Sequence, residues 1–145
     1  VMKLSAVYFR HHFLRIIRTN HMWRVVESGS GVSYCLERLA LCKFYRVAEV
    51  CQELGCSQRY MHAMFMRDIG FPPKQWMMME RMVVAKRKLE GGKSPEEVAG
   101  DLGFMSIGPF RRQFFRFYQI YPERFVKSRR IFDPSKIEQL EEMPG

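Results

Sequence analysis

The sequence predicts an all-α fold in which two helix-turn-helix subdomains are joined by a long linker helix and preceded by an N-terminal helical extension. Apolar residues recur at helical spacing almost throughout, and no long alternating segment favours a strand. One pattern of helix, glycine turn, capped helix and proline occurs twice. Between the two copies, residues 73–90 have no internal glycine or proline. These observations together favour a duplicated helical motif.

The composition narrows the class of protein. The 145 residues include 24 Lys and Arg against 15 Asp and Glu, a formal net charge of +9, and 47% are hydrophobic. That apolar content is too high for a disordered chain, and no run reaches the roughly 18 apolar residues of a membrane span. The length suits one compact unit or a small domain with an extension. We therefore expect a cytoplasmic globular protein without a membrane partner.

Metal, cofactor and catalytic chemistry find no support in the sequence. The four cysteines lack the C-x-x-C pair of most zinc and redox sites, and no histidine has metal-ligand spacing. Gly92-Lys93-Ser94 resembles the end of a phosphate-binding loop, but Arg87 stands where that loop needs its first glycine. No nucleophile–base pair is evident. We predict no metal, no cofactor and no enzymatic activity.

Residues 1–32 are expected to form a helical extension, or the remnant of an upstream domain or linker. Within them, residues 6–18 show a basic amphipathic helical pattern with Phe9, Phe13, Ile16 and Ile17 on its apolar side. The simpler interpretation is a helix that packs on the domain or mediates dimerisation, and the alternative is a membrane-surface helix. Gly29-Ser30-Gly31 follows as an expected flexible joint.

The first helix-turn-helix motif is expected at residues 46–69, within a domain covering residues 33–130. Gly55 can end its first helix in a left-handed conformation, and the Ser57 hydroxyl can cap its second helix. The apolar faces of the two helices are expected to consist of Val47, Val50, Cys51 and Leu54, and of Met61, Met64 and Phe65.

A linker helix over residues 73–90 connects the two motifs, with Met82, Ala85 and Leu89 spaced to face a core. At 1.5 Å per residue, a helix of this length spans about 27 Å. Successive segments of the DNA major groove lie about 34 Å apart. A rigid linker would therefore allow two recognition helices to enter neighbouring groove segments.

The second motif, at residues 95–118, repeats the first. Ser94 and Glu97 form a capping box with Pro95 at the first helical position. Gly103 is the expected stop and Ser106 the next cap. The buried residues are expected to be Val98, Ala99 and Leu102, followed by Phe110, Phe114 and Phe117. Beyond residue 130, the segment 131–145 is expected to form an acidic tail.

These residues resemble the DNA-binding domain of the AraC/XylS family of bacterial transcription regulators. The likeness covers about residues 35–130 and includes Val47–Ser57 and Gly70–Pro73 in the first motif and Val98–Phe104 in the second. It implies seven helices, no cofactor, and double-stranded DNA bound at one asymmetric site by both motifs. Family members also carry an effector domain, for which residues 1–32 are too short, so we expect a shortened or stand-alone regulator.

Two positions depart from the family pattern. Gln119 stands where the family usually has glycine, so a turn there must place a non-glycine residue at positive φ. Ile107-Gly108-Pro109 replaces polar residues that many members show at the start of the second recognition helix. Direct reading of bases by the second motif is therefore expected to be weak.

The predicted base contacts of the first motif are Gln58, Arg59, His62 and Ala63. Arg59 can bond O6 and N7 of guanine, Gln58 suits adenine or a phosphate, and Ala63 can touch a thymine methyl group. The resemblance also implies base contacts at Arg59, His62 and Ala63. The alternatives are a phosphate or solvent contact for Arg59 and a simple surface imidazole for His62.

In the second motif, the predicted DNA contacts are Ile107, Gly108, Arg111 and Arg112. Base reading and phosphate binding are equally open for the two arginines. The helix N-termini at Ser57 and Ser106 are predicted to hold phosphates, as are Arg67 and Arg116. From Met105 to Arg130 the sequence has only one acidic side chain, Glu123, among many basic ones, which favours a polyanionic partner.

The predicted function is a sequence-specific regulator of transcription that binds double-stranded DNA in the bacterial cytoplasm, at the nucleoid. The alternative is a helical interaction module that contacts RNA polymerase or another regulator and has only non-specific affinity for DNA. RNA polymerase, and a second copy bound through a region upstream of this domain, are further candidate partners. Competition with random duplex distinguishes the two functions.

Overall fold

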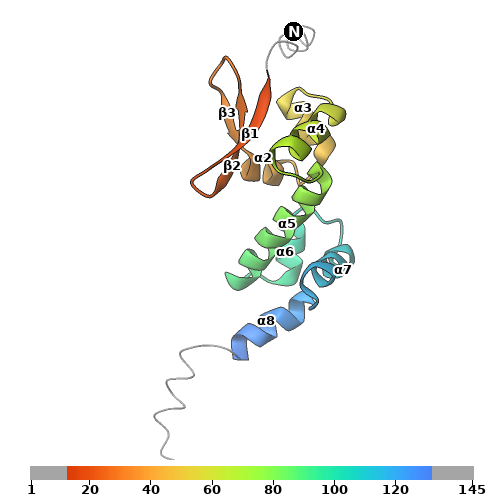
Figure 1. Ribbon diagram of the computed structural model, residues 1–145. Helices are drawn as coiled ribbons and strands as arrows, with labels where there is room; N and C mark the ends of the chain where they lie inside the picture. The colour runs from red at the N-terminus through yellow and green to blue at the C-terminus, as the bar shows by residue number, and fades with distance from the viewer. Residues whose placement is uncertain (1–12, 132–145) are drawn as a thin grey trace, which may run out of the picture. The chain divides into compact units, whose positions relative to one another are not determined.

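The computed structural model describes residues 13–131 (Figure 1). Over this range, a three-stranded antiparallel sheet precedes seven helices. The chain divides into two compact units, residues 1–81 and residues 82–145. The prediction of an all-α fold is confirmed only in part: the two motifs and the linker are helical, but the N-terminus forms a sheet where a helical extension was expected.

The N-terminal sheet takes the place of the predicted helix. Strand β1 (Leu14–Thr19) pairs with β2 (Met22–Glu27), and β2 pairs with β3 (Ser33–Cys35). In β1 the buried residues are every second one, because side chains alternate between the faces of a strand. Residues 1–12 of the predicted extension lie outside the described residues.

Two tight turns connect the strands. Asn20 and His21 join β1 to β2 with φ angles of 50° and 66°. Left-handed residues at both central positions form the type of turn whose twist suits an antiparallel hairpin. The expected flexible joint at Gly29-Ser30-Gly31 is instead the turn between β2 and β3, closed by a hydrogen bond of 3.0 Å from the Glu27 amide to the Val32 carbonyl.

Three helices of the first unit follow the sheet. The first is α2 (Leu36–Cys42), and the first motif consists of α3 (Val47–Leu54) and α4 (Gln58–Asp68). As predicted, α3 ends at Gly55 in a left-handed conformation, with φ of 67°. The hydroxyl of Ser57 accepts a hydrogen bond of 3.0 Å from the Tyr60 amide at the start of α4. The buried side chains include Val50, Leu54, Met61, Met64 and Phe65.

One continuous helix, α5 (Pro73–Glu90), connects the two units. Its first half places Trp76 and Met77 in the core of the first unit. The Trp76 ring packs edge-on against Phe65, with ring centroids 5.9 Å apart. The second half buries Met82, Ala85 and Leu89, as predicted.

The second unit contains α6 (Pro95–Asp101), α7 (Ile107–Tyr118) and α8 (Pro122–Ile131). The predicted capping box is present: the Ser94 hydroxyl accepts from the Glu97 amide at 3.2 Å, and the Glu97 carboxylate accepts from the Ser94 amide at 3.1 Å. The core is built from Val98, Ala99, Leu102, Phe110 and Phe114. The predicted acidic tail lies outside the described residues, apart from Ile131.

Two details of α7 differ from the predictions. Ser106 occupies the N-cap position, but its backbone is fully extended and its side chain makes no capping hydrogen bond. Phe117, expected to be buried, is 36% exposed. Tyr118 takes the inward position one turn beyond Phe114, and its hydroxyl donates to the Met82 carbonyl at 3.0 Å. The expected positive φ of Gln119 is confirmed, at 61°.

Candidate nucleic-acid interface

The four predicted base-contact residues of the first motif share one exposed side of α4. Gln58, Arg59, His62 and Ala63 are all exposed. Since successive residues turn by about 100°, these four cover an arc of about 140° around the helix axis. The opposite side of the helix is buried in the core. This exposed side of α4, defined by these four residues, is here named the recognition side.

Arg59 is well placed on the recognition side. It lies in the first turn of α4, directly after the capped N-terminus at Ser57. No residue between 13 and 131 forms an ion pair or side-chain hydrogen bond with Arg59, and the same holds for His62. Because the Ser57 hydroxyl already caps the helix, its remaining capacity for a phosphate is limited. The guanidinium of Arg59 is available to an external acceptor.

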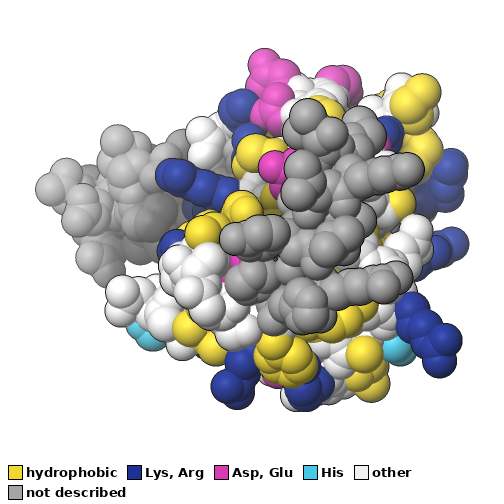
Figure 2. All heavy atoms as spheres, turned by 90° about the horizontal axis from the view of Figure 1, so that it is seen from above, with side chains coloured by type: hydrophobic (Ala, Val, Ile, Leu, Met, Phe, Trp, Pro, Cys, Tyr) yellow, Lys and Arg dark blue, Asp and Glu magenta, His cyan; other side chains and the backbone are white. Residues whose placement is uncertain are grey.

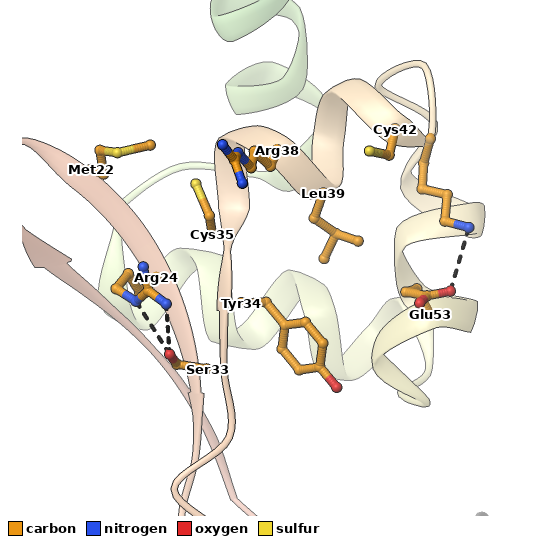
Figure 3. Close-up of a pocket in the computed structure, with 10 residues that line it drawn as sticks. Met22, Arg24, Ser33, Tyr34, Cys35, Arg38, Leu39, Cys42 and Glu53 are labelled. Carbon is orange, nitrogen blue, oxygen red and sulfur yellow. Dashed lines mark hydrogen bonds and ion pairs between the residues drawn. The ribbon is translucent and has the colours of Figure 1, made fainter.

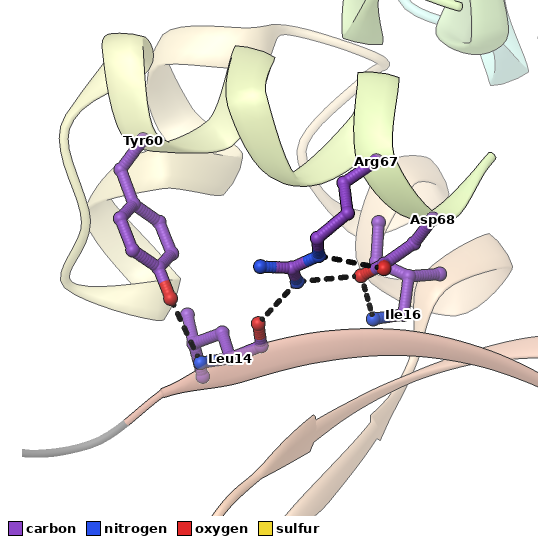
Figure 4. A network of polar contacts seen from close by, with 5 residues as sticks. All are labelled: Leu14, Ile16, Tyr60, Arg67 and Asp68. Atoms are coloured by element: carbon purple, nitrogen blue, oxygen red, sulfur yellow. Dashed lines mark hydrogen bonds and ion pairs between the residues drawn. The ribbon is translucent and has the colours of Figure 1, made fainter. Parts of the chain in front are cut away.

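Arg67, a predicted phosphate contact, takes part in a network that joins α4 to β1 (Figure 4). Its Nη2 donates to the Leu14 carbonyl at 2.8 Å, and Nε and Nη2 donate to the two carboxylate oxygens of Asp68 at 2.8 and 2.7 Å. Asp68 also accepts from the Ile16 amide at 2.8 Å, and the Tyr60 hydroxyl accepts from the Leu14 amide at 2.9 Å. A phosphate at Arg67 stays a prediction and would share the guanidinium with these partners.

This network shifts the pKa of the Asp68 carboxyl. Hydrogen bonds from the Arg67 guanidinium and the Ile16 amide lower that pKa, because they favour the ionised form, and they outweigh the opposing effect of burial. This arrangement was not predicted from the sequence, because a helix was expected where β1 lies. The adjacent basic and acidic residues at the end of α4 were the available signal.

In the second motif, the predicted arginines are exposed on α7 but differ in their surroundings. Arg111 Nε forms an ion pair of 2.9 Å with Glu123 of α8. Arg112 and Arg116 have no ion pair with any residue that the structure describes. Ile107 and Gly108 are half-buried. The cations of α7 that are open to an external anion are therefore those of Arg112 and Arg116.

Gly108 is the counterpart of Arg59 in the repeat and brings no side chain. Arg112 lies next to this position: its Nη1 is 3.5 Å from the point that a Cβ at residue 108 would occupy. The Arg112 guanidinium therefore reaches back toward the start of α7. Ser106, whose hydroxyl does not cap the helix, lies directly before the same turn.

A hollow of about 460 Å³ lies between α7 and α8. Its lining combines Arg111, Arg124 and Lys127 with Tyr121, Glu123 and Ser128. Since cationic side chains outnumber the single carboxylate, the hollow suits a phosphate group. The basic character of this stretch is evident in the sequence, but no DNA contact was predicted for Arg124 or Lys127.

A second hollow, of about 570 Å³, lies along β2 and β3 next to α2 and α3 (Figure 3). Arg24 in this hollow donates to the Ser33 hydroxyl from Nη2 at 2.7 Å and from Nε at 3.3 Å. Lys43 forms an ion pair of 3.4 Å with Glu53. Arg38 also lines the hollow and is exposed. No sequence pattern indicated this hollow, because the hollow depends on the sheet.

The described residues were also compared with the requirements of cysteine chemistry, metal binding and membrane insertion. Cys35, Cys42, Cys51 and Cys56 are free. Burial, together with the neighbouring Cys51, raises the pKa of the Cys56 thiol to about 12. Residues 13–131 contain no group of three side chains that could hold a metal ion. Over the same range, no helix is both long enough and apolar enough to cross a bilayer.

The chain matches a helix-turn-helix family and several solved structures of regulators. A family model described as a helix-turn-helix domain matches residues 50–128. Among solved structures, the chain is similar to the C-terminal domain of the two-component response regulator yesN from Fusobacterium nucleatum subsp. nucleatum. The identity is 25% and the TM-score 0.55, over 63% of this chain and 94% of that one.

Two further structures share the fold at lower identity. The xylose-binding transcription activator xylR has 21% identity and a TM-score of 0.52, over 63% of this chain and 24% of its own. A probable AraC family transcriptional regulator from Rhodopseudomonas palustris has 20% identity and a TM-score of 0.50, over 63% of this chain and 91% of its own. No curated protein sequence gives a significant match. Because the family model covers more than half of the chain, this protein belongs to the AraC-type helix-turn-helix family of DNA-binding transcription regulators.

Proposed function

We propose that the chain reads a specific DNA sequence mainly through the recognition side of α4, with Arg59 as the principal base contact. The observation that carries the proposal is that Gln58, Arg59, His62 and Ala63 are exposed together at the start of a helix whose other side buries Met61, Met64 and Phe65. In helix-turn-helix proteins, the N-terminal residues of the second helix contact base edges in the major groove. Arg59 has the reach and free donors for a bidentate contact with guanine, which is worth about 1–3 kcal/mol of discrimination.

The other three residues on this side have complementary roles. Gln58 lies at the first helical position, where it can reach an adenine edge or a phosphate. His62 can donate to or accept from a base one turn further along the helix. Ala63 is short enough to bring the helix close to the bases and to touch a thymine methyl group.

The second motif is proposed to hold the DNA backbone more than it reads bases. Gly108 replaces the arginine of the first motif, while Arg112 and Arg116 carry the open cations of α7. Arg111, Arg124 and Lys127 add positive charge at the hollow beside α8. The N-terminal amides of α7 after Ser106 are also available to a phosphate.

Both motifs are proposed to bind the same duplex, in successive segments of the major groove. The support is the continuity of α5, which runs without a break from one unit to the other. RNA polymerase and a second copy of the chain are proposed as further partners. The expected place of action is the bacterial cytoplasm, at the nucleoid.

The test begins with selection of bound sequences from a random pool of DNA duplexes. The dissociation constant of the chain is then measured on the selected site and on random duplex. A specific regulator should prefer the selected site by about 10³-fold or more. A preference below tenfold would favour the alternative function, an interaction module with incidental affinity for DNA.

Two arginine variants assign the roles. Arg59→Ala should weaken binding to the selected site by about tenfold to a hundredfold and leave binding to random duplex almost unchanged. Arg116→Ala, the matched control, should weaken both equally and lower the salt dependence by about one unit. An equal loss on both duplexes for Arg59→Ala would show that Arg59 contacts only the backbone.

A further inference from the structure

We infer that the exposed face of the N-terminal sheet is a second DNA-contacting surface, which binds backbone phosphates beside the segment read by α4. This face, here named the basic sheet face, comprises Arg15, Ile17 and Thr19 of β1 and Met22 and Arg24 of β2. The inference rests on the proposed function of α4. It assigns DNA contact to a part of the chain that precedes the matched family region, residues 50–128.

The sheet is fixed to the recognition helix by hydrogen bonds. The outer edge of β1 faces α4, where Tyr60, Arg67 and Asp68 bond the main-chain groups of Leu14 and Ile16 at 2.8 to 2.9 Å (Figure 4). Figure 1 shows β1 as the strand between α4 and the rest of the sheet. The strand and the helix therefore present their surfaces as one body.

The two exposed surfaces point away from the same core. Leu14, Ile16 and Val25 on one face of the sheet are buried, as is the side of α4 that contains Met64 and Phe65. Because side chains alternate along a strand, Arg15 and Ile17 lie on the opposite face. The basic sheet face and the recognition side of α4 are consequently both directed outward.

Arg67 connects these two surfaces. Its guanidinium lies 4.4 Å from the ring centroid of Phe13, which precedes Leu14 and has the same orientation as Arg15. On α4, Arg67 lies one turn beyond Ala63, at the border of the recognition side. The surface is therefore continuous from the recognition side, across Arg67, to the basic sheet face.

The charge on this surface suits DNA. The one carboxylate of β1 and β2, Glu27, is paired in register with Leu14 and so lies on the other face. Arg15 is exposed, although it lies close enough to Asp68 to contribute to the lowered pKa of that carboxyl. Arg24 and Arg38 both line the neighbouring hollow (Figure 3). Figure 2 shows Lys and Arg side chains in several places on the visible side.

The apolar members of the face are compatible with the same partner. Ile17 and Met22 are 39% and 41% exposed. Side chains of this kind can pack against deoxyribose, while the arginines between them meet the phosphates. A strand of six residues spans about 20 Å, which corresponds to about six base pairs of duplex at 3.4 Å each. The face is thus long enough for one to three phosphate contacts.

The inference is tested by the salt dependence of DNA binding. The double variant Arg15→Gln/Arg24→Gln is compared with Lys43→Gln/Arg46→Gln, which removes the same charge from cations already paired with Glu53 and Glu49. The full chain is titrated with the selected duplex and with random duplex between about 0.05 and 0.3 M salt. The first variant should bind both duplexes about tenfold more weakly, with a salt slope smaller by 1 to 2 units. The control should keep the slope of the parent chain.

The outcomes separate this inference from the proposed function. An unchanged slope for Arg15→Gln/Arg24→Gln overturns the inference, even if Arg59→Ala behaves as proposed. If the double variant differs from the parent chain in sedimentation coefficient but not in salt slope, the inference is also overturned, because the face would then contact a second copy of the chain. Because Arg24 also bonds Ser33, the single variant Arg15→Gln is measured too and should lower the slope by about one unit. If the parent chain shows no preference for the selected site over random duplex, that result refutes sequence reading by α4. It does not by itself refute phosphate contact by the basic sheet face, which the salt slope on random duplex measures.

Discussion

Replacement of Asp68 by alanine should lower the free energy of unfolding of the first unit by about 2–3 kcal/mol. The substitution removes the acceptor of the Ile16 amide and two of the three acceptors of the Arg67 guanidinium, which keeps only the Leu14 carbonyl. A hydrogen bond to a charged group contributes about 1.5–3 kcal/mol, and a donor left without a partner adds a desolvation cost. The Asp68 side chain is only 9% exposed, whereas that of Arg67 is 40% exposed. We therefore assign most of the loss to the bond with Ile16.

The fluorescence of tryptophan provides a selective assay. Both tryptophans of the chain, Trp23 and Trp76, lie in the first unit, so urea unfolding followed by fluorescence reports on that unit. With an m-value of about 1–2 kcal/mol/M, the expected loss of about 2–3 kcal/mol moves the urea midpoint down by about 1–3 M. The matched control is Asp101→Ala, which removes an exposed carboxylate paired with Lys88 and Lys93 in the second unit. The control should leave the fluorescence midpoint where it is.

The same carboxylate predicts a dependence on pH. Its pKa is lowered in the folded chain, so folding is favoured while the group is ionised. The stabilisation is fully present above the unfolded pKa of about 3.9 and is lost as the pH falls through the lower, folded value. The difference in midpoint between the parent chain and Asp68→Ala should therefore be constant near pH 7 and shrink below about pH 4. A midpoint for Asp68→Ala equal to that of Asp101→Ala at pH 7 would refute the assigned role of this network.

Three further predictions concern single residues. Gln119→Gly should increase the free energy of unfolding by about 0.5–1 kcal/mol and so raise the melting temperature measured by circular dichroism, because glycine adopts the positive φ without strain. Gln119→Ala should lower the melting temperature. Ser94→Ala should cost about 1 kcal/mol in a chemical unfolding series, whereas Ser106→Ala should cost little, because Ser106 makes no capping bond. At pH 8, Cys56 should react with iodoacetamide much more slowly than the exposed Cys42, as peptide mapping would show; equal rates would contradict the raised pKa of Cys56.

The helices of the two motifs were predictable because local signals and burial agree there. The hydroxyl of Ser57 and the capping box at Ser94 begin helices, and the left-handed Gly55 ends one. Each signal acts within a few residues in sequence, so it can be recognised without knowledge of the tertiary fold. The apolar spacing on α4 and α6 then identified the buried sides correctly.

The sheet was not predicted because its main support is not local. Ile16 and Ile17 are adjacent, which is compatible with the edge of an amphipathic helix as well as with a strand. The strand is favoured over the helix because Ile16 pairs with Val25 in β2 and its amide bonds Asp68, which is far along the chain. The Asn20-His21 turn was the local signal, since asparagine is one of the residues that adopt positive φ most readily.

In the candidate site, too, the features set by local helical spacing were predictable and those set by tertiary packing were not. The outward direction of Arg59 and His62 followed from helical spacing and agrees with their exposure. The partners of Arg67 and Arg111 did not follow, because each pairs with a residue whose position depends on tertiary packing. The ring of Phe117 was misassigned because Tyr118 occupies the inward position and bonds the Met82 carbonyl.

The bonds between α4 and β1 also affect how the protein behaves at high concentration. A strand at the border of a sheet presents unpaired amides and carbonyls, which invite the strands of other molecules to add on. Here the main-chain groups of Leu14 and Ile16 already have side-chain partners. The opposite border is β3, only three residues long. Among the described strands, the sheet therefore offers little length for growth into larger β-aggregates.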